Sequence, residues 1–89
     1  MVGMNTAFLL MAQYEGKAVI PADDVRRDYF SHLTLDQFLR KVGHGDIELP
    51  LIRIEASQKC AKGVHLQDLA DYLDAKRAAA KKELAQLTG

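Results

Sequence analysis

Two different periodicities follow each other in residues 34–64, and this change of pattern constrains the fold more than any other feature of the 89-residue chain. At about 100° per residue, a helix over residues 34–43 collects apolar side chains on one arc and polar side chains on the other. The apolar arc holds Leu35, Phe38, Leu39 and Val42, and the polar arc holds Gln37, Arg40, Lys41 and His44. The pattern predicts a helix with one face for a core and one for a polar partner.

A basic hairpin is expected directly after this helix. Gly43 and Gly45 suit a helix end and a turn, where a positive φ costs glycine little. The following segment, LPLIRIE, has the alternation and β-branched content of a strand, and ASQKCAKG is a small, polar, basic loop. We therefore expect a wing over residues 49–64. A helix with exposed amide and guanidinium groups beside such a hairpin is the layout of a winged helix-turn-helix that presents both to one DNA duplex.

Three more segments complete the expected fold. A helix capped by Asn5 or Thr6 runs to about Gln13 and is apolar nearly all round, so we expect burial on more than one side, by core closure or by a dimer contact. Residues 22–30 form the first helix of the motif, with acids in its first turn. Residues 65–87 form one long helix whose acids precede its bases. Dimerisation through this last helix is a further hypothesis.

Composition indicates one small domain over residues 1–89, mainly α and of the α+β class. Hydrophobic residues make up 48% and charged residues 27%, as in ordinary globular domains. Burial in a domain of this size is marginal, so we expect a homodimer. The longest apolar run is far below the roughly 20 residues of a membrane span, and no signal peptide is evident, which predicts a cytoplasmic protein away from membranes. Residues 1–3 precede Met4, an equally good start.

Several quoted segments together resemble the pyocin activator protein (PrtN) family, a family of phage- and bacteriocin-associated transcriptional activators. The segments are NTAFLLMAQYEGKAVIP, DYF with HLT, LRKVGHGDIELPLIRIE, SQKCAKGVHLQDLADYLD and AKRAAAKKEL. The similarity covers residues 4–87, and it implies a DNA-binding activator that recognises short promoter elements upstream of bacteriocin or prophage genes. More distantly, the order of elements is similar to the winged helices of phage excisionases and MerR-type regulators.

The polar arc of the helix over residues 34–43 supplies the candidates for reading bases. Arg40 and Lys41 can donate to guanine O6 and N7 or to phosphate, and Gln37 can pair with an adenine edge. We expect base readout from Gln37 and Arg40, with His44 on the same face. Arg26 and Arg27 can reach phosphates or form an ordinary solvated face, and the sequence leaves both interpretations open.

The wing supplies the candidates for positioning the protein on DNA. Ser57, Gln58, Lys59 and Lys62 suit phosphate or minor-groove contacts, which carry little sequence information. Arg53 is a weaker candidate, because it can also pair with Glu48 or Glu55. The formal net charge is zero, which argues against a nucleic-acid protein. Charges are screened beyond about 8 Å, however, so the local excess of bases in the wing matters more.

Other chemistry is poorly supported by the sequence. His32, His44 and His65 are too scattered for a helical metal pair, and one cysteine forms no cysteine-rich zinc site, so we expect no metal and no cofactor. A nucleophile at Ser57 or Cys60 would need a positioned base, and so small a domain has little room for a substrate cleft. We expect neither an enzyme nor a small-molecule substrate.

Three functions remain open. The first is a sequence-specific activator that binds double-stranded promoter DNA as a dimer and recruits RNA polymerase. The second is an excisionase-like architectural protein that bends DNA, and the third is a small protein-protein adaptor with a winged fold, which the zero net charge favours. The operator sequence, the activation surface and the terminal helix that forms a dimer do not follow from the residues.

Overall fold

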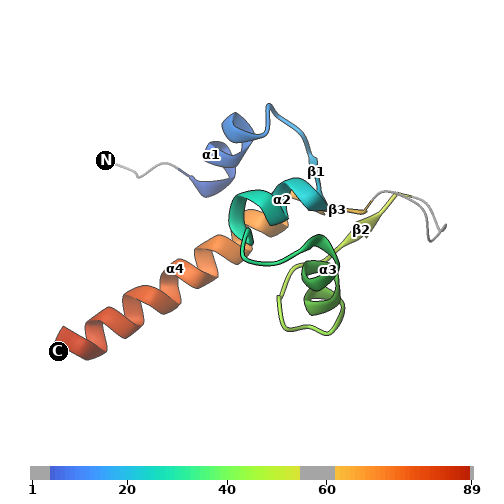
Figure 1. Ribbon diagram of the computed structural model, residues 1–89. Helices are drawn as coiled ribbons and strands as arrows, with labels where there is room; N and C mark the ends of the chain where they lie inside the picture. The colour runs from blue at the N-terminus through green and yellow to red at the C-terminus, as the bar shows by residue number, and fades with distance from the viewer. Residues whose placement is uncertain (1–4, 55–61, 89) are drawn as a thin grey trace.

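A computed structural model of the chain describes residues 5–54 and 62–88, which form four helices and one three-stranded antiparallel sheet (Figure 1). In chain order the elements are α1 (Thr6–Gln13), β1 (Val19–Pro21), α2 (Ala22–Tyr29), α3 (Leu35–Gly43), β2 (Ile52–Arg53), β3 (Lys62–His65) and α4 (Leu66–Thr88). The expected mainly helical α+β class is confirmed. The helices over residues 34–43 and 65–87 are present within one residue of the predicted bounds.

The sheet has the order β1-β3-β2, so β3 pairs with strands on both sides. Val19 lies opposite His65 in the β1–β3 pair, and Ile52 lies opposite Gly63 in the β2–β3 pair. Glycine is favoured at position 63, because a Cβ atom there would lie 2.5 Å from Cγ1 of Val19 and 3.0 Å from the carbonyl oxygen of Ile20. Pairing of β3 with β1 ties the expected wing to the N-terminal half of the chain.

The strand expected for LPLIRIE is shorter than predicted, since the described part of it is extended only at Ile52–Arg53. Pro50 has no N–H group and cannot donate to a strand ladder. Before it, Ile47 and Leu49 are buried, and the Ile47 N–H donates to the carbonyl oxygen of Lys41 at 3.3 Å. The residues before Ile52 therefore pack in the core beside α3, and the chain joins the sheet only at Ile52–Arg53.

The core lies between α2, α3, the sheet and the first turns of α4. Phe30, directly after α2, connects these layers: its ring centroid lies 5.0 Å from that of Phe38 on α3 and 5.9 Å from that of Tyr72 on α4. The largest fully buried side chains are Phe38, Ile20, Leu69, Val25 and Val64. Because these residues come from α3, β1, α4, α2 and β3, each of these elements is held by its own buried side chain.

The prediction that α1 is buried on more than one side is wrong for the described chain. Only Leu10 of α1 is buried, and Phe8, Leu9 and Met11 are 60%, 47% and 50% exposed. The inner side of α1 packs mainly against the start of α4 (Figure 1), and its last residue, Gln13, forms hydrogen bonds with Asp28 and Tyr29 of α2.

Polar contacts fix α1 at both ends. At its start, Thr6 Oγ1 donates to Asp74 Oδ1 of α4 at 2.5 Å. At its end, the Tyr14 hydroxyl donates to Asp28 Oδ2 of α2 at 2.7 Å, and burial followed by the Asp28 carboxylate raises the pKa of Tyr14. The outer face of α1 is therefore presented in a defined orientation.

Only the first turns of α4 belong to the core. Leu66, Leu69 and Ala70 are buried, and every residue from 74 to 88 is exposed, so the helix projects past the core (Figure 1). The His65 ring assists the start of the helix, since its Nδ1 accepts the Gln67 N–H at 3.0 Å. Among the described residues, each helix is too short or too polar to cross a membrane.

Candidate nucleic-acid interface

The start of α3 is fixed by a capping box. The Gln37 N–H donates to Thr34 Oγ1 at 3.2 Å, and the Thr34 N–H donates to Gln37 Oε1 at 2.9 Å. Two N–H groups that a helix start normally leaves unpaired are thereby satisfied. The Thr-x-x-Gln spacing carries this signal in the sequence, but the box was not predicted, because Gln37 was considered only as a reader of bases.

The connection between α2 and α3 is held by Arg26. Its Nη1 donates to the carbonyl oxygen of Leu33 at 3.1 Å, and its Nε donates to Asp23 Oδ1 at 2.6 Å. Arg27 lies 3.3 Å from Asp24 Oδ1 and 3.6 Å from Asp28 Oδ1. Both arginines thus face carboxylates of their own helix, an arrangement that favours the structural interpretation over phosphate contact.

The two-sided character of α3 is confirmed with one exception. Phe38 is fully buried, and Leu39 and Val42 pack against the core. Leu35 is 36% exposed instead of buried, because it lies in the first turn, at the edge of the core. The opposite side presents Gln37, Arg40, Lys41 and His44, all exposed. The polar side of α3 is therefore open to a large partner.

The capping box limits what Gln37 can do on this surface. A bidentate contact to adenine needs the amide oxygen as acceptor and the amide nitrogen as donor. The oxygen already accepts the Thr34 N–H, so a bidentate contact would have to share this oxygen, whereas the amide nitrogen can donate while the box is intact. Arg40 and Lys41, by contrast, form no ion pair with any described residue.

Two bases lie opposite each other in the β2–β3 pair. Arg53 and Lys62 are Cα partners in the antiparallel register, where like charges are destabilising unless an anion lies between or above them. Within the described residues neither makes an ion pair, so the alternative pairing of Arg53 with Glu48 is not formed, and the other predicted partner, Glu55, lies outside the described residues. The other predicted wing residues, Ser57, Gln58 and Lys59, lie outside the described residues, as does Cys60.

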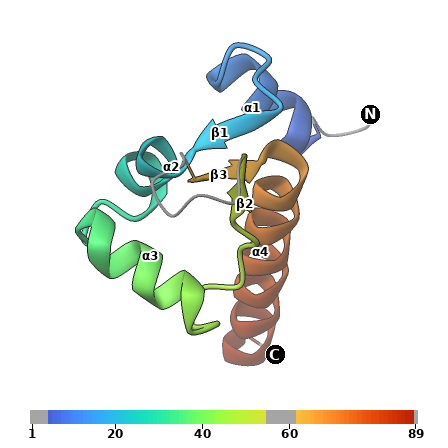
Figure 2. The same ribbon diagram turned by 90° about the vertical axis from the view of Figure 1, so that its right-hand side faces the viewer.

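The helix and the strand pair share one end of the molecule. In Figure 1, α3 and β2 lie toward one side of the molecule, and the C-terminal end of α4 extends to the opposite side; Figure 2 views the molecule from the side of α3 and β2. The basic residues of α3 and those of the β2–β3 pair can therefore meet one extended partner. In the described part of the chain, no group of three or more His, Cys, Asp or Glu side chains is placed to hold a metal ion.

Comparison with known proteins gives one match. Neither curated proteins nor solved structures produced a match. The family model described as "Pyocin activator protein PrtN" matches residues 6–80, a range that begins with α1 and ends within α4 and so includes the whole sheet and the α2–α3 pair. The resemblance read from the sequence is confirmed, and the chain belongs to the pyocin activator protein PrtN family.

Proposed function

We propose that this protein is a sequence-specific, DNA-binding transcriptional activator of pyocin or prophage genes. In this proposal the fold acts as a winged helix-turn-helix, with α3 as the recognition helix and the β2–β3 hairpin as the wing. Membership of the family supports the activator role. The proposal needs no catalytic step, no metal and no cofactor.

The observation that carries the proposal is the outer side of α3, where Arg40 and Lys41 are exposed and unpaired among the described residues. The Arg53–Lys62 pair adds two bases at the same end of the fold. A polyanion would relieve the repulsion between these two bases and neutralise both basic sites together. The zero net charge is compatible with this, because acids are concentrated on α2 and α4 and charges are screened beyond about 8 Å.

Different residues would carry different parts of recognition. Arg40 suits bidentate contact with guanine O6 and N7. Lys41, Arg53 and Lys62 suit phosphates, which position a protein on DNA without reading sequence. Gln37 can offer its amide nitrogen as a single donor while its oxygen stays in the capping box. His44 follows α3 directly and lies on the same exposed side.

The test compares binding of the full chain to the promoter region of adjacent phage-tail or bacteriocin genes with binding to a random duplex, at two salt concentrations. Affinity should be higher for the promoter and should fall steeply with salt, because bound phosphates release counterions. Arg40→Ala should weaken promoter binding by about 1–3 kcal/mol, or about 5- to 150-fold, and should leave the fold intact. Arg27→Ala is the matched control, since Arg27 is held by Asp24 and Asp28.

The outcomes separate the open functions. An equal loss for Arg40→Ala on both duplexes would mean that Arg40 contacts phosphate and not a base. Binding that bends DNA but does not raise transcription in a reconstituted system with RNA polymerase would indicate the architectural function. Equal, weak, salt-insensitive binding to both duplexes would contradict the proposal and favour the adaptor.

A further inference from the structure

The outer side of α1 is an uncovered apolar surface. The helix carries no ionisable side chain, and the residues that follow one another around its outer side are Met11, Phe8, Ala12 and Leu9, all exposed. A monomeric protein rarely leaves a contiguous surface of this kind in water. Because α1 itself offers no charge to pair, whatever covers it must be largely apolar at the point of contact.

A second uncovered surface runs along the α4 tail (residues 74–88), in which every residue is exposed. At about 1.5 Å per residue, the tail extends roughly 22 Å, and helices of this length are marginal in water without packing. Ala80, Leu84 and Leu87 continue the side of α4 that carries Leu66 and Leu73 into the core. Leu84 and Leu87 remain 60% and 85% exposed.

The charges along α4 indicate what covers these surfaces. The first turns of the helix carry only acids, namely Asp68, Asp71 and Asp74, and the tail carries Lys76, Arg77, Lys81 and Lys82, with Glu83 as its one acid beyond Asp74. None of these bases forms an ion pair with a described residue. One straight helix cannot bring its own tail beside its own first turns. A second copy that runs in the opposite direction brings the tail bases on the contact side, such as Lys81, to the acids of the other.

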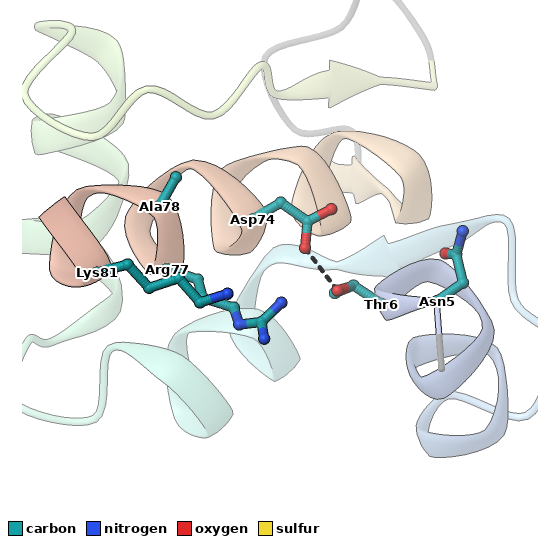
Figure 3. Close-up of a pocket in the computed structure, with 6 residues that line it drawn as sticks. All are labelled: Asn5, Thr6, Asp74, Arg77, Ala78 and Lys81. Carbon is teal, nitrogen blue, oxygen red and sulfur yellow. Dashed lines mark hydrogen bonds between the residues drawn. The ribbon is translucent and has the colours of Figure 1, made fainter. Parts of the chain in front are cut away.

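A groove beside α4 is lined by both an acid and bases of this helix. It is lined by Asn5, Thr6, Asp74, Arg77, Ala78 and Lys81, and Arg77 and Lys81 extend on the side of α4 on which Asp74 meets Thr6 (Figure 3). The four α4 residues are spaced by three, one and three positions, so they form one stripe. A two-fold axis between Arg77 and Ala78 places Asp74 opposite Lys81 of the second copy, and Lys81 opposite its Asp74.

We propose that two copies of this chain associate through an antiparallel pair of α4 helices about this axis, and that the end of each tail lies against the outer side of α1 in the other copy. The same contact covers Leu84 and Leu87 with Phe8, Leu9 and Met11. The α3 and β2 elements lie away from the end of the tail (Figure 1), so both copies keep them free. The inference goes beyond the proposed DNA binding and does not depend on it.

The first test is the mass of the full chain in solution by sedimentation equilibrium over a range of concentrations. The expected mass is twice 9.9 kDa. Lys81→Asp should weaken association at least tenfold, because it places two acids opposite each other. Lys76→Asp makes the same change on the opposite side of the tail, where Lys76 lies over the Tyr72 ring, and should change association less than twofold.

Exchange of the two charges tests the direction of the pair. Asp74→Lys combined with Lys81→Asp in one chain should restore association, since the antiparallel contact is rebuilt with its signs reversed. A parallel pair would set like charges opposite each other in both proteins and would gain nothing. A monomer at every concentration, or a dimer that neither Lys81→Asp weakens nor the exchange restores, would overturn the proposal.

Cysteine cross-linking and an α1 variant test the two contact surfaces directly. In a Cys60→Ser background, Ala78→Cys should form a disulfide-linked dimer on mild oxidation, because the axis passes beside it, and Ala79→Cys, on the opposite side of α4, should not. Phe8→Ser should weaken association at least tenfold with an unchanged far-ultraviolet circular dichroism spectrum, since its ring is mostly exposed in one copy. Equal cross-linking at both alanines would overturn the axis, and normal association of Phe8→Ser would overturn the role of α1.

Discussion

Gln37 caps α3 and is proposed to contact DNA, and a pair of substitutions can separate the observed role from the proposed one. Its side-chain oxygen accepts the Thr34 N–H at 2.9 Å, and in the proposed function its amide nitrogen donates to a DNA base. Gln37→Ala removes both roles. Gln37→Glu keeps an acceptor at the third position of α3, where glutamate also completes capping boxes, but removes the amide donor and adds a negative charge.

The expected stabilities follow from the contact. A net hydrogen bond contributes about 0.5–1.5 kcal/mol, and the higher helix propensity of alanine offsets a few tenths. Gln37→Ala should therefore lower the free energy of unfolding by about 0.5–1 kcal/mol, or the Tm by roughly 2–8 °C. Gln37→Glu should match or exceed the wild type by about 0.3–1 kcal/mol, because a negative charge is favourable at a helix N-terminus.

Thermal unfolding and promoter binding, measured on the same samples, check both roles of Gln37. Both variants should bind the promoter more weakly than the wild type, although only Gln37→Ala is less stable. A Tm of Gln37→Glu as low as that of Gln37→Ala would refute the capping box. Wild-type promoter binding by Gln37→Glu would refute the placement of Gln37 at the DNA surface.

Three other predictions concern the core and its pH dependence. Phe38→Ala, at a fully buried position, should lower the free energy of unfolding by about 3–5 kcal/mol in urea titrations, and a similar loss for the half-exposed Leu35→Ala would contradict the orientation of α3. Gly63→Ala should cost about 1–3 kcal/mol by crowding β1, whereas Gly43→Ala, with nothing within 4 Å of the new Cβ, should be neutral or stabilising; equal melting temperatures of the two would refute the close β1–β3 contact. Tyr14→Phe should be less stable than the wild type by about 1 kcal/mol at neutral pH. Because the pKa of Tyr14 is raised in the folded protein, its hydroxyl contributes stability below the unfolded pKa of about 10, and the difference should shrink as the pH rises above that value; a constant difference between pH 8 and 11 would argue against the buried hydroxyl contact.

Local patterns predicted α2, α3 and α4 well, because a helix face and its ends depend on residues three and four positions apart. Phe38 and Val42 point inward and Arg40 outward, as their spacing indicates. Hydrophobicity alone misled the interpretation of α1, where Phe8 and Leu9 are apolar but exposed. Burial of an apolar side chain is favourable. Whether that side chain is buried within a single chain depends on which other elements pack against it.

The sequence predicted which side chains are exposed at the candidate site, but it predicted only some of the contacts that these side chains make. Arg40 and Lys41 are exposed on one side of α3, as expected. The role of Gln37 changed because its side-chain oxygen accepts the Thr34 N–H within the capping box. For Arg26 and Arg27 the structural interpretation is favoured over phosphate contact, because both arginines form ion pairs with acids of the same helix, namely Asp23, Asp24 and Asp28.

The sequence by itself determined the helices, the two-sided character of α3 and the family, because these depend on local spacing and on residue identity. Only the tertiary structure decided that β3 lies at the centre of the sheet, paired with β1 as well as β2. It also decided that α1 has an open apolar side and that the α4 tail lies outside the core. The physical reason is that strand pairing between distant segments and packing of a shared core depend on all elements at once. A local sequence pattern does not specify which distant segment packs against an element.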